Sequence, residues 1–127
     1  MKASIVIPNF NGEALLEKNM PIFLKAKDFT QNNIEEIILI DDGSSDNSVR
    51  FIKAKYPGIK LIRHSKNRGF SASVNTGARM AKGDLIVLLN TDVLPNEGFL
   101  VSILPYFEDE SVFAVSMHEK NYTWAKG

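Results

Sequence analysis

Acidic and amide side chains follow three apolar runs of this sequence, at the positions where strands would end. The first run leads into Pro8 and Asn9, the second into Asp41 and Asp42, and a later one into Asn90-Thr91-Asp92. Ligands of open parallel sheets bind beyond the carboxyl ends of the strands, so these side chains would share one cleft. Carboxylate and amide oxygens suit Mg²⁺ or Mn²⁺, and such a cation would in turn hold a diphosphate.

The acidic residues of the second cluster have different interpretations. Gly43 and two serines separate Asp41 from the next predicted helix, which argues against a capping role. Its carboxylate could instead accept a hydrogen bond from the imide N–H of a uracil or thymine and so select the base. Asp46 stands just before Val49 and Ile52, and a helix cap is the favoured interpretation there.

The last cluster matters most for a metal. Asp92 is the predicted metal ligand, because a carboxylate carries the charge that Mg²⁺ or Mn²⁺ requires. Asn90 would bind ribose hydroxyls or add a neutral ligand oxygen. A plain turn leading into Pro95 explains the same residues without chemistry, and local composition does not decide between the two interpretations.

A further segment could meet a phosphate. It consists of Arg68, Gly69 and the free N–H groups of a helix predicted from Ser71. The P-loop motif is absent, and no Gly-x-Gly-x-x-Gly follows the first strand, which argues against P-loop nucleotidases and dinucleotide oxidoreductases. His64 and His118 are each isolated from any Ser and Asp arrangement, so neither is predicted to be catalytic.

Short β-branched runs alternate with segments of helical period. Strands are predicted at 3–7, 36–40, 59–62, 85–89 and 112–117, and helices at 12–27, between 45 and 57, at 71–82 and at 96–107. Pro21 is expected to divide the first helix, and Gly83 to cap the third. Buried strands with helical crossovers indicate an α/β fold, a mostly parallel sheet with helices on both faces.

Composition argues against several classes of protein. The 127 residues include 15 basic and 15 acidic side chains, and this balance argues against a partner such as nucleic acid or an anionic membrane surface. The absence of cysteine excludes thiol nucleophiles, Cys-based metal sites and disulfides. The first apolar stretch is too short for a signal peptide, and no run approaches the roughly 20 residues of a membrane span, so a cytoplasmic location is expected.

Four blocks of sequence carry a family resemblance. They are SIVIPNFNG at 4–12, IDDGSSD at 40–46, NRGFSASVNTG at 67–77 and AKGDLIVLLNTD at 81–92. In this order and spacing they resemble the family 2 glycosyltransferases, over residues 3 to about 117. The resemblance implies the GT-A fold and transfer of a sugar from a nucleotide-diphospho-sugar, UDP- or dTDP-linked, to an acceptor hydroxyl, with inversion in most members.

The resemblance also implies roles for single residues. The implied nucleotide-binding residues are Pro8, Asn9, Asp41, Asp42, Asn67, Arg68, Gly69 and Asn90. Among them, Asp41 would bind the base. Asp92 would hold Mg²⁺ or Mn²⁺, as the metal-binding member of the family's Asp-x-Asp motif. Asn90 stands where the family usually has Asp, a form similar to rhamnosyltransferase-like branches that often act on dTDP-sugars.

In the family, the catalytic base and the acceptor pocket lie C-terminal to the matched region, which would place them beyond Gly127. We therefore expect a donor-binding domain over 1–117 and a tail over 118–127 that leads into an acceptor-binding part, with the chain inactive alone. The whole protein would act on a saccharide or lipid-linked acceptor in cell-wall or polysaccharide biosynthesis, in association with a membrane in some members. An apolar surface left without its partner would give a weak homo-oligomer.

Two other functions compete with this one. A non-catalytic nucleotide-binding or interaction module could keep the same fold without turnover. A nucleotidyltransferase that makes the sugar nucleotide is disfavoured, because Asn-Phe-Asn-Gly follows the first strand where that class has a glycine-rich loop with Arg and Lys.

Overall fold

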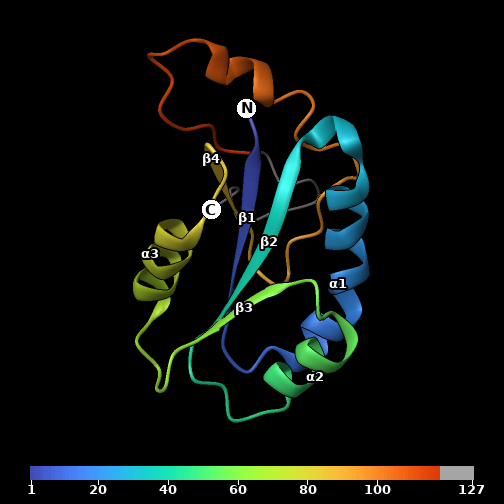
Figure 1. Cartoon of the computed structure of the whole chain (residues 1–127), viewed down its shortest axis with the longest axis vertical. Helices are drawn as coiled ribbons and strands as arrows, with labels where there is room; N and C mark the ends of the chain where they lie inside the picture. Colours follow the sequence, from blue (N-terminus) through green and yellow to red (C-terminus); the bar gives the residue numbers. More distant parts are fainter. Residues whose placement is uncertain (118–127) are drawn as a thin grey trace, which may run out of the picture.

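The chain folds around a four-stranded parallel sheet with the order β3-β2-β1-β4 (Figure 1). The computed structural model describes residues 1–117, and His118 and the predicted tail over 118–127 lie outside the described residues. The strands are β1 (Ala3–Asn9), β2 (Ile34–Asp41), β3 (Lys60–Arg63) and β4 (Leu85–Leu88). The helices are α1 (Glu13–Asp28), α2 (Ser48–Lys55) and α3 (Phe70–Met80), with 3-10 turns at Thr30–Asn32 and Leu104–Glu108.

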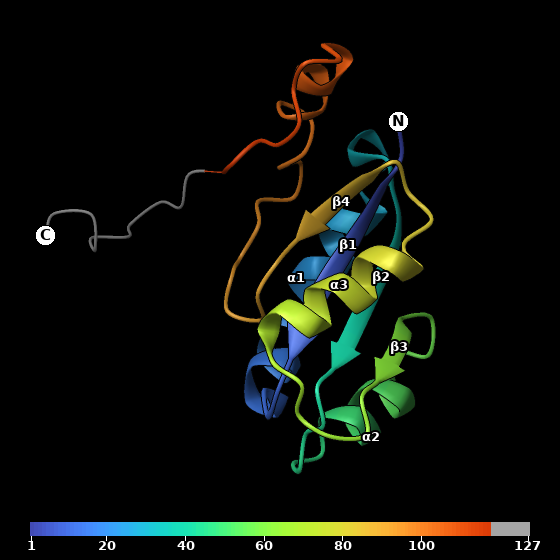
Figure 2. The same cartoon turned by 90° about the vertical axis from the view of Figure 1, so that its left-hand side faces the viewer.

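The two faces of the sheet are covered by different helices. α1 and α2 lie on one face and α3 on the other (Figures 1 and 2). Side chains alternate between the two faces along β1, so Ile5 joins the cluster that contains Phe23 of α1, whereas Val6 packs with Ile38 on the α3 side. α3 lies close to β1 because Gly77 faces Val6 with no room for a Cβ. The predicted α/β fold with a mostly parallel sheet is confirmed.

β1 extends through Pro8, although the sequence predicts that Pro8 ends it. The Asn9 carbonyl accepts a hydrogen bond from Asp42 on the β2 side, so the backbone of Pro8 faces the opposite side. There β4 pairs with β1 only up to Val6. The missing N–H of proline therefore costs no hydrogen bond of the sheet.

α1 is continuous through Pro21, so the predicted division of this helix is wrong. A proline in a helix interior costs about 3 kcal/mol and leaves the carbonyl four residues earlier without its donor. Leu16, Met20 and Phe23 are fully buried against the sheet on the other face of α1, and this packing outweighs the local preference. No helix described over residues 1–117, this one included, is long and apolar enough to cross a bilayer.

The sequence predicts that Gly83 caps α3, and this prediction is wrong. The helix ends at Met80, and Ala81 is already extended. The Gly83 N–H donates to Ser4 Oγ at 2.8 Å. A Cβ at this position would lie 2.8 Å from the Lys2 carbonyl oxygen and the Ser4 nitrogen. The glycine is needed for the close approach of the α3–β4 connection to β1.

The segment after β4 departs most from prediction. No α-helix forms over 96–107: turns at 97–103 are followed by the 3-10 turn Leu104–Glu108. The Leu100 N–H donates to Asn32 Oδ1 at 3.1 Å, so a tertiary contact uses a group that a helix would need. No strand forms over 112–117 either, where Phe113 is 97% exposed and pairs with no strand of the sheet.

Candidate functional site

Loops from four parts of the chain meet at the carboxyl edge of the sheet. The turns after β1, β2 and β4 and the loop before α3 enclose a cavity of about 310 Å³. It is lined by Pro8, Asn9, Phe10, Asp42, Asn67, Gly69, Phe70, Ser73 and Asn90. The structure therefore brings together most of the predicted nucleotide-binding residues, whereas Asp41, Arg68 and Asp92 are not part of the lining.

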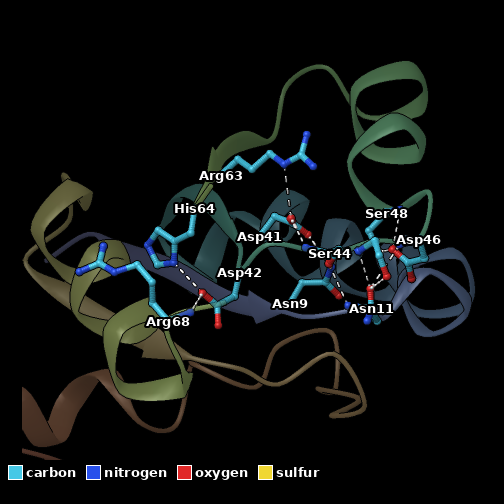
Figure 3. Close-up of polar contacts among 11 residues, drawn as sticks. Asn9, Asn11, Asp41, Asp42, Ser44, Asp46, Ser48, Arg63, His64 and Arg68 are labelled. Carbon is cyan, nitrogen blue, oxygen red and sulfur yellow. Dashed lines mark hydrogen bonds and ion pairs between the residues drawn. The ribbon is translucent and has the colours of Figure 1, made fainter. Parts of the chain in front are cut away.

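Asp41, at the end of β2, is fully buried and holds two loops together (Figure 3). Its Oδ1 accepts hydrogen bonds from Asn9 Nδ2 at 3.1 Å and from Ser44 Oγ at 2.7 Å, and its Oδ2 accepts one from the Ser44 N–H at 3.0 Å. Arg63 Nε lies 4.0 Å from Oδ2. The carboxylate oxygens are engaged within the protein, and the contact of Asp41 with a base stays a prediction.

Asp42, the next residue, is 4% exposed and contacts the loop before α3. Its Oδ1 accepts hydrogen bonds from His64 Nδ1 at 2.7 Å and from the Arg68 N–H at 2.9 Å, and its Oδ2 accepts one from the Gly69 N–H at 2.9 Å. Burial raises the pKa of Asp42, but these hydrogen bonds lower the pKa by more, so that it falls below its ordinary 3.8. Asp42 is therefore ionised at neutral pH.

Two glycines with positive φ shape the loops around the cavity. Gly43 has φ +80°, and a Cβ on it would lie 2.7 Å from the Asn67 nitrogen and from the Lys66 carbonyl carbon. Gly69 has φ +100°, directly before α3. Positive φ disfavours a side chain at both positions. At Gly43 the close approach of the Lys66–Asn67 backbone also leaves no room for one.

A polar bridge joins the starts of α1 and α2. Asn11, with φ 53°, accepts a hydrogen bond from the Ser45 N–H at 2.8 Å. Asp46 accepts hydrogen bonds from the Glu13 N–H and the Ser48 N–H, both at 3.0 Å. These are free donors in the first turns of the two helices, so Asp46 stabilises both helix starts, although the N-cap position of α2 itself is Asn47 and not Asp46 as the sequence favoured.

The turn after β4 is held by its backbone and leaves its acidic side chain free. The Thr91 carbonyl accepts a hydrogen bond from Asn19 Nδ2 at 2.7 Å, and the Val93 N–H donates to the Asn90 carbonyl at 3.1 Å. Asn90 and Asp92 are exposed. Asp92 makes no side-chain hydrogen bond or ion pair with any residue between 1 and 117.

This arrangement fits a cation that is shared with a ligand. Within residues 1–117, no group of three or more acidic or histidine side chains could hold a metal by itself. Mg²⁺ usually binds through one or two carboxylates together with substrate phosphates. Asp92 offers one free carboxylate, two residues after the cavity-lining Asn90. The donor set suits Mg²⁺ or Mn²⁺ in the presence of a diphosphate.

Four residues of this region were not predicted from the sequence: Phe10, Phe70, Ser73 and His64. Phe10 and Phe70 line the cavity and are each 52% exposed. Both stand next to a predicted residue in a recognised block, so their positions could have been noticed. His64 has no such neighbour, and only its place at the end of β3 indicates this edge of the sheet.

A wider hollow of about 610 Å³ lies elsewhere, between α2 and the end of β3. Arg50, Lys53 and Arg63 line it together with Asp46, and it contains none of the predicted site residues. The smaller cavity is therefore the candidate site, because the predicted residues converge only there.

A parallel α/β sheet with a cavity at its carboxyl edge, lined by polar and aromatic side chains, defines a Rossmann-like ligand-binding domain. Residues 4–126 match the family model of Glycosyl transferase family 2, and the chain belongs to that family. The family resemblance noted from the four sequence blocks is thus confirmed.

Individual relatives show how much of a protein the match covers. The chain is 33% identical over 96 residues to a dolichol-phosphate mannosyltransferase from Pyrococcus furiosus, a match to 73% of this chain and 26% of that protein. It is 31% identical over 127 residues to the glycosyltransferase GlyG from Streptococcus pneumoniae, with 98% and 41% covered. The chain thus spans well under half the length of these relatives.

The fold is shared with solved structures. A mannosyltransferase from Pyrobaculum calidifontis, PcManGT, in complex with GDP-Man and Mn²⁺, superposes with a TM-score of 0.73 at 23% identity, covering 87% of this chain and 33% of that one. The structure of Staphylococcus aureus TarS 1-349 in complex with UDP-GlcNAc gives 0.72 at 20% identity, covering 86% of this chain and 32% of that one.

Proposed function

We propose that this chain is the donor-binding part of a glycosyltransferase that transfers a sugar from a UDP- or dTDP-linked donor to an acceptor hydroxyl, with inversion. The observation that carries the proposal is the cavity of about 310 Å³, in which Asn9, Asp42, Gly69 and Asn90 come together from four segments. In this proposal residues 1–117 form the donor-binding domain.

The lining suits a nucleoside more than a bare phosphate. Phe10 and Phe70 offer half-exposed rings for packing against a base or sugar. Asn9 is 3% exposed and its Nδ2 donates to Asp41 Oδ1 at 3.1 Å and to Ser44 Oγ at 3.4 Å, so its side chain forms a fixed part of the cavity wall. Asn90, exposed at the same cavity, offers both a donor and an acceptor.

Asp92 would hold Mg²⁺ or Mn²⁺ against the diphosphate. When bound, the cation supplies positive charge that stabilises the leaving nucleoside diphosphate. The complex of PcManGT with GDP-Man and Mn²⁺ supports a divalent cation in a protein of this fold.

Transfer also needs a base that removes the acceptor proton from the side opposite the leaving group. We assign the base and the acceptor site to the part of the relatives that this chain does not span, so that residues 1–127 bind the donor but do not transfer its sugar. A saccharide or lipid-linked acceptor is consistent with relatives whose names include a dolichol-phosphate mannosyltransferase and an undecaprenyl-phosphate arabinose-type transferase from Aeromonas hydrophila.

Calorimetric titration tests the proposal. UDP and dTDP with MnCl₂ or MgCl₂ are expected to bind one per chain, more weakly when the cation is removed with EDTA, and GDP more weakly than either. Asn90→Ala should weaken binding, whereas Lys53→Ala, in the wider hollow, should leave it unchanged. Absence of heat and of thermal stabilisation with every nucleotide at millimolar concentration would contradict the proposal.

A further inference from the structure

His64 is a buried histidine at the end of β3 with both ring nitrogens paired (Figure 3). It is 6% exposed. Its Nδ1 lies 2.7 Å from Asp42 Oδ1, and its Nε2 lies 2.9 Å from Thr76 Oγ1 of α3. His64 therefore joins three elements, because its main-chain N–H also donates to the Asp41 carbonyl at 2.8 Å.

The Asp42 carboxylate fixes the role of one ring nitrogen of His64. An ionised carboxylate only accepts hydrogen bonds, so Nδ1 must donate to Asp42. Nε2 pairs with the Thr76 hydroxyl, a group that can both donate and accept a hydrogen bond. This arrangement, a carboxylate with a histidine N–H behind it, fixes the orientation of both groups.

The carboxylate that His64 orients is the acceptor for the loop before α3. Asp42 receives the main-chain N–H groups of Arg68 and Gly69, each at 2.9 Å. Gly69 lines the cavity, and Phe70, which follows it, begins α3 and lines the cavity as well. A rotation of the Asp42 carboxylate would release both N–H groups and move this wall of the cavity.

From these contacts we propose that His64 is a positioning residue of the donor site, which acts through Asp42 to hold Arg68 and Gly69 where a nucleoside diphosphate binds. This inference rests on the proposed function. His64 itself does not line the cavity, and it sets affinity through the geometry of the loop.

Three substitutions separate the two ends of the ring. Asn at position 64 carries its amide N–H₂ near the place of Nδ1 and can still donate to Asp42, whereas Gln carries it near the place of Nε2 and reaches Thr76 instead. Thr76→Val removes the Nε2 partner while it leaves the bond to Asp42. His64→Gln should weaken binding of UDP with MnCl₂ by about tenfold, the effect of one hydrogen bond to a charged group.

His64→Asn should keep most of the affinity, and Thr76→Val should lower the melting temperature but leave affinity within about twofold. A purely structural role predicts the opposite pattern, in which affinity follows stability across all three variants. Wild-type affinity in His64→Gln, or equal losses in His64→Gln and His64→Asn, overturns the inference.

Amide hydrogen exchange tests the inference without any ligand. His64→Gln should speed exchange at Arg68 and Gly69, and His64→Asn should not, with the amides of β1 as the internal reference. If wild-type protein binds no nucleotide, the proposed function fails and exchange alone decides whether His64 holds the loop. Unchanged exchange at both amides in His64→Gln would show that His64 does not hold the loop.

Discussion

The ends of β2 and β4 carry similar residues and use them in opposite ways. Asp41 and Asp42 are 0% and 4% exposed, and every carboxylate oxygen accepts a hydrogen bond from the protein. Asn90 and Asp92, at the end of β4, are exposed, and Asp92 has no partner among residues 1–117. Asp41 and Asp42 hold the loops of the protein in place, whereas Asn90 and Asp92 are free to contact a ligand.

The position of each strand in the sheet explains the difference. β2 lies between β3 and β1, so loops surround its end on both sides. β4 is at the edge of the sheet and has a strand neighbour on one side only. The acidic residues at the two strand ends therefore have different roles, because more neighbouring loops donate hydrogen bonds to the carboxylates after β2 than to the carboxylate after β4.

The same substitution at the two ends should give the largest contrast. Asp41→Ala leaves Asn9 Nδ2 and two donors of Ser44 without their acceptor and should lower the free energy of unfolding by about 3 kcal/mol. Asp92→Ala should change it by less than about 0.5 kcal/mol. Urea unfolding without ligand measures both, and equal losses would remove the distinction between the two ends.

Gly43 tests how tightly the β2 end is packed. Gly43→Ala places a Cβ against the backbone of Lys66 and Asn67 at positive φ and should cost about 2 kcal/mol. Gly58→Ala is the matched control, since a Cβ there meets nothing within 4 Å, and it should be close to neutral. A mild effect at Gly43 would mean that the two loops separate easily.

Asp92 tests the free end. Asp92→Asn should weaken the binding of UDP with MnCl₂ by at least about tenfold, because a charged ligand of the cation is lost. Without a cation, the variant and the wild type should bind alike. Asp28→Asn, at the exposed end of α1, is the control and should bind as the wild type does. The experiment is a pair of calorimetric titrations, with MnCl₂ and with EDTA. Retention of the Mn²⁺ effect in Asp92→Asn would assign the cation to another group.

The smallest expected effect is a dependence of stability on pH. Burial raises the pKa of Asp46, but hydrogen bonds from Ser48 and Glu13 lower it by more, to below its ordinary 3.8. The stabilisation is thus present above pH 4 and is lost as the pH falls through the lowered pKa of the folded state. Urea unfolding between pH 2 and 6 gives the free energy of unfolding as a function of pH. This free energy should vary less with pH in Asp46→Asn than in the wild type, and as in the wild type in Asp92→Asn.

Sequence patterns predicted the four strands of the sheet and the class of the fold because apolar runs and turn residues are local properties, but the strand predicted at 112–117 does not form. The predictions were wrong where contacts between distant residues determine the local structure. α1 continues through Pro21 because its other face is buried. The helix predicted at 96–107 does not form, and there the Leu100 N–H donates to Asn32. The candidate site was found as a set of strand ends, since parallel strands share one edge. The difference between Asp41 and Asp92 could not be predicted, because it depends on neighbours far along the chain.

The contact of Asp42 with the loop before α3 has a consequence for protein engineering. Asp42 binds main-chain N–H groups, so the loop geometry does not depend on which side chain stands at position 68. Figure 3 shows the Arg68 side chain extending away from Asp42. Position 69 is restricted to glycine by its φ of +100°, but position 68 is open to every residue except proline, which lacks the N–H that Asp42 binds. A library at this residue would alter chemistry beside the cavity while the backbone that frames it stays in place.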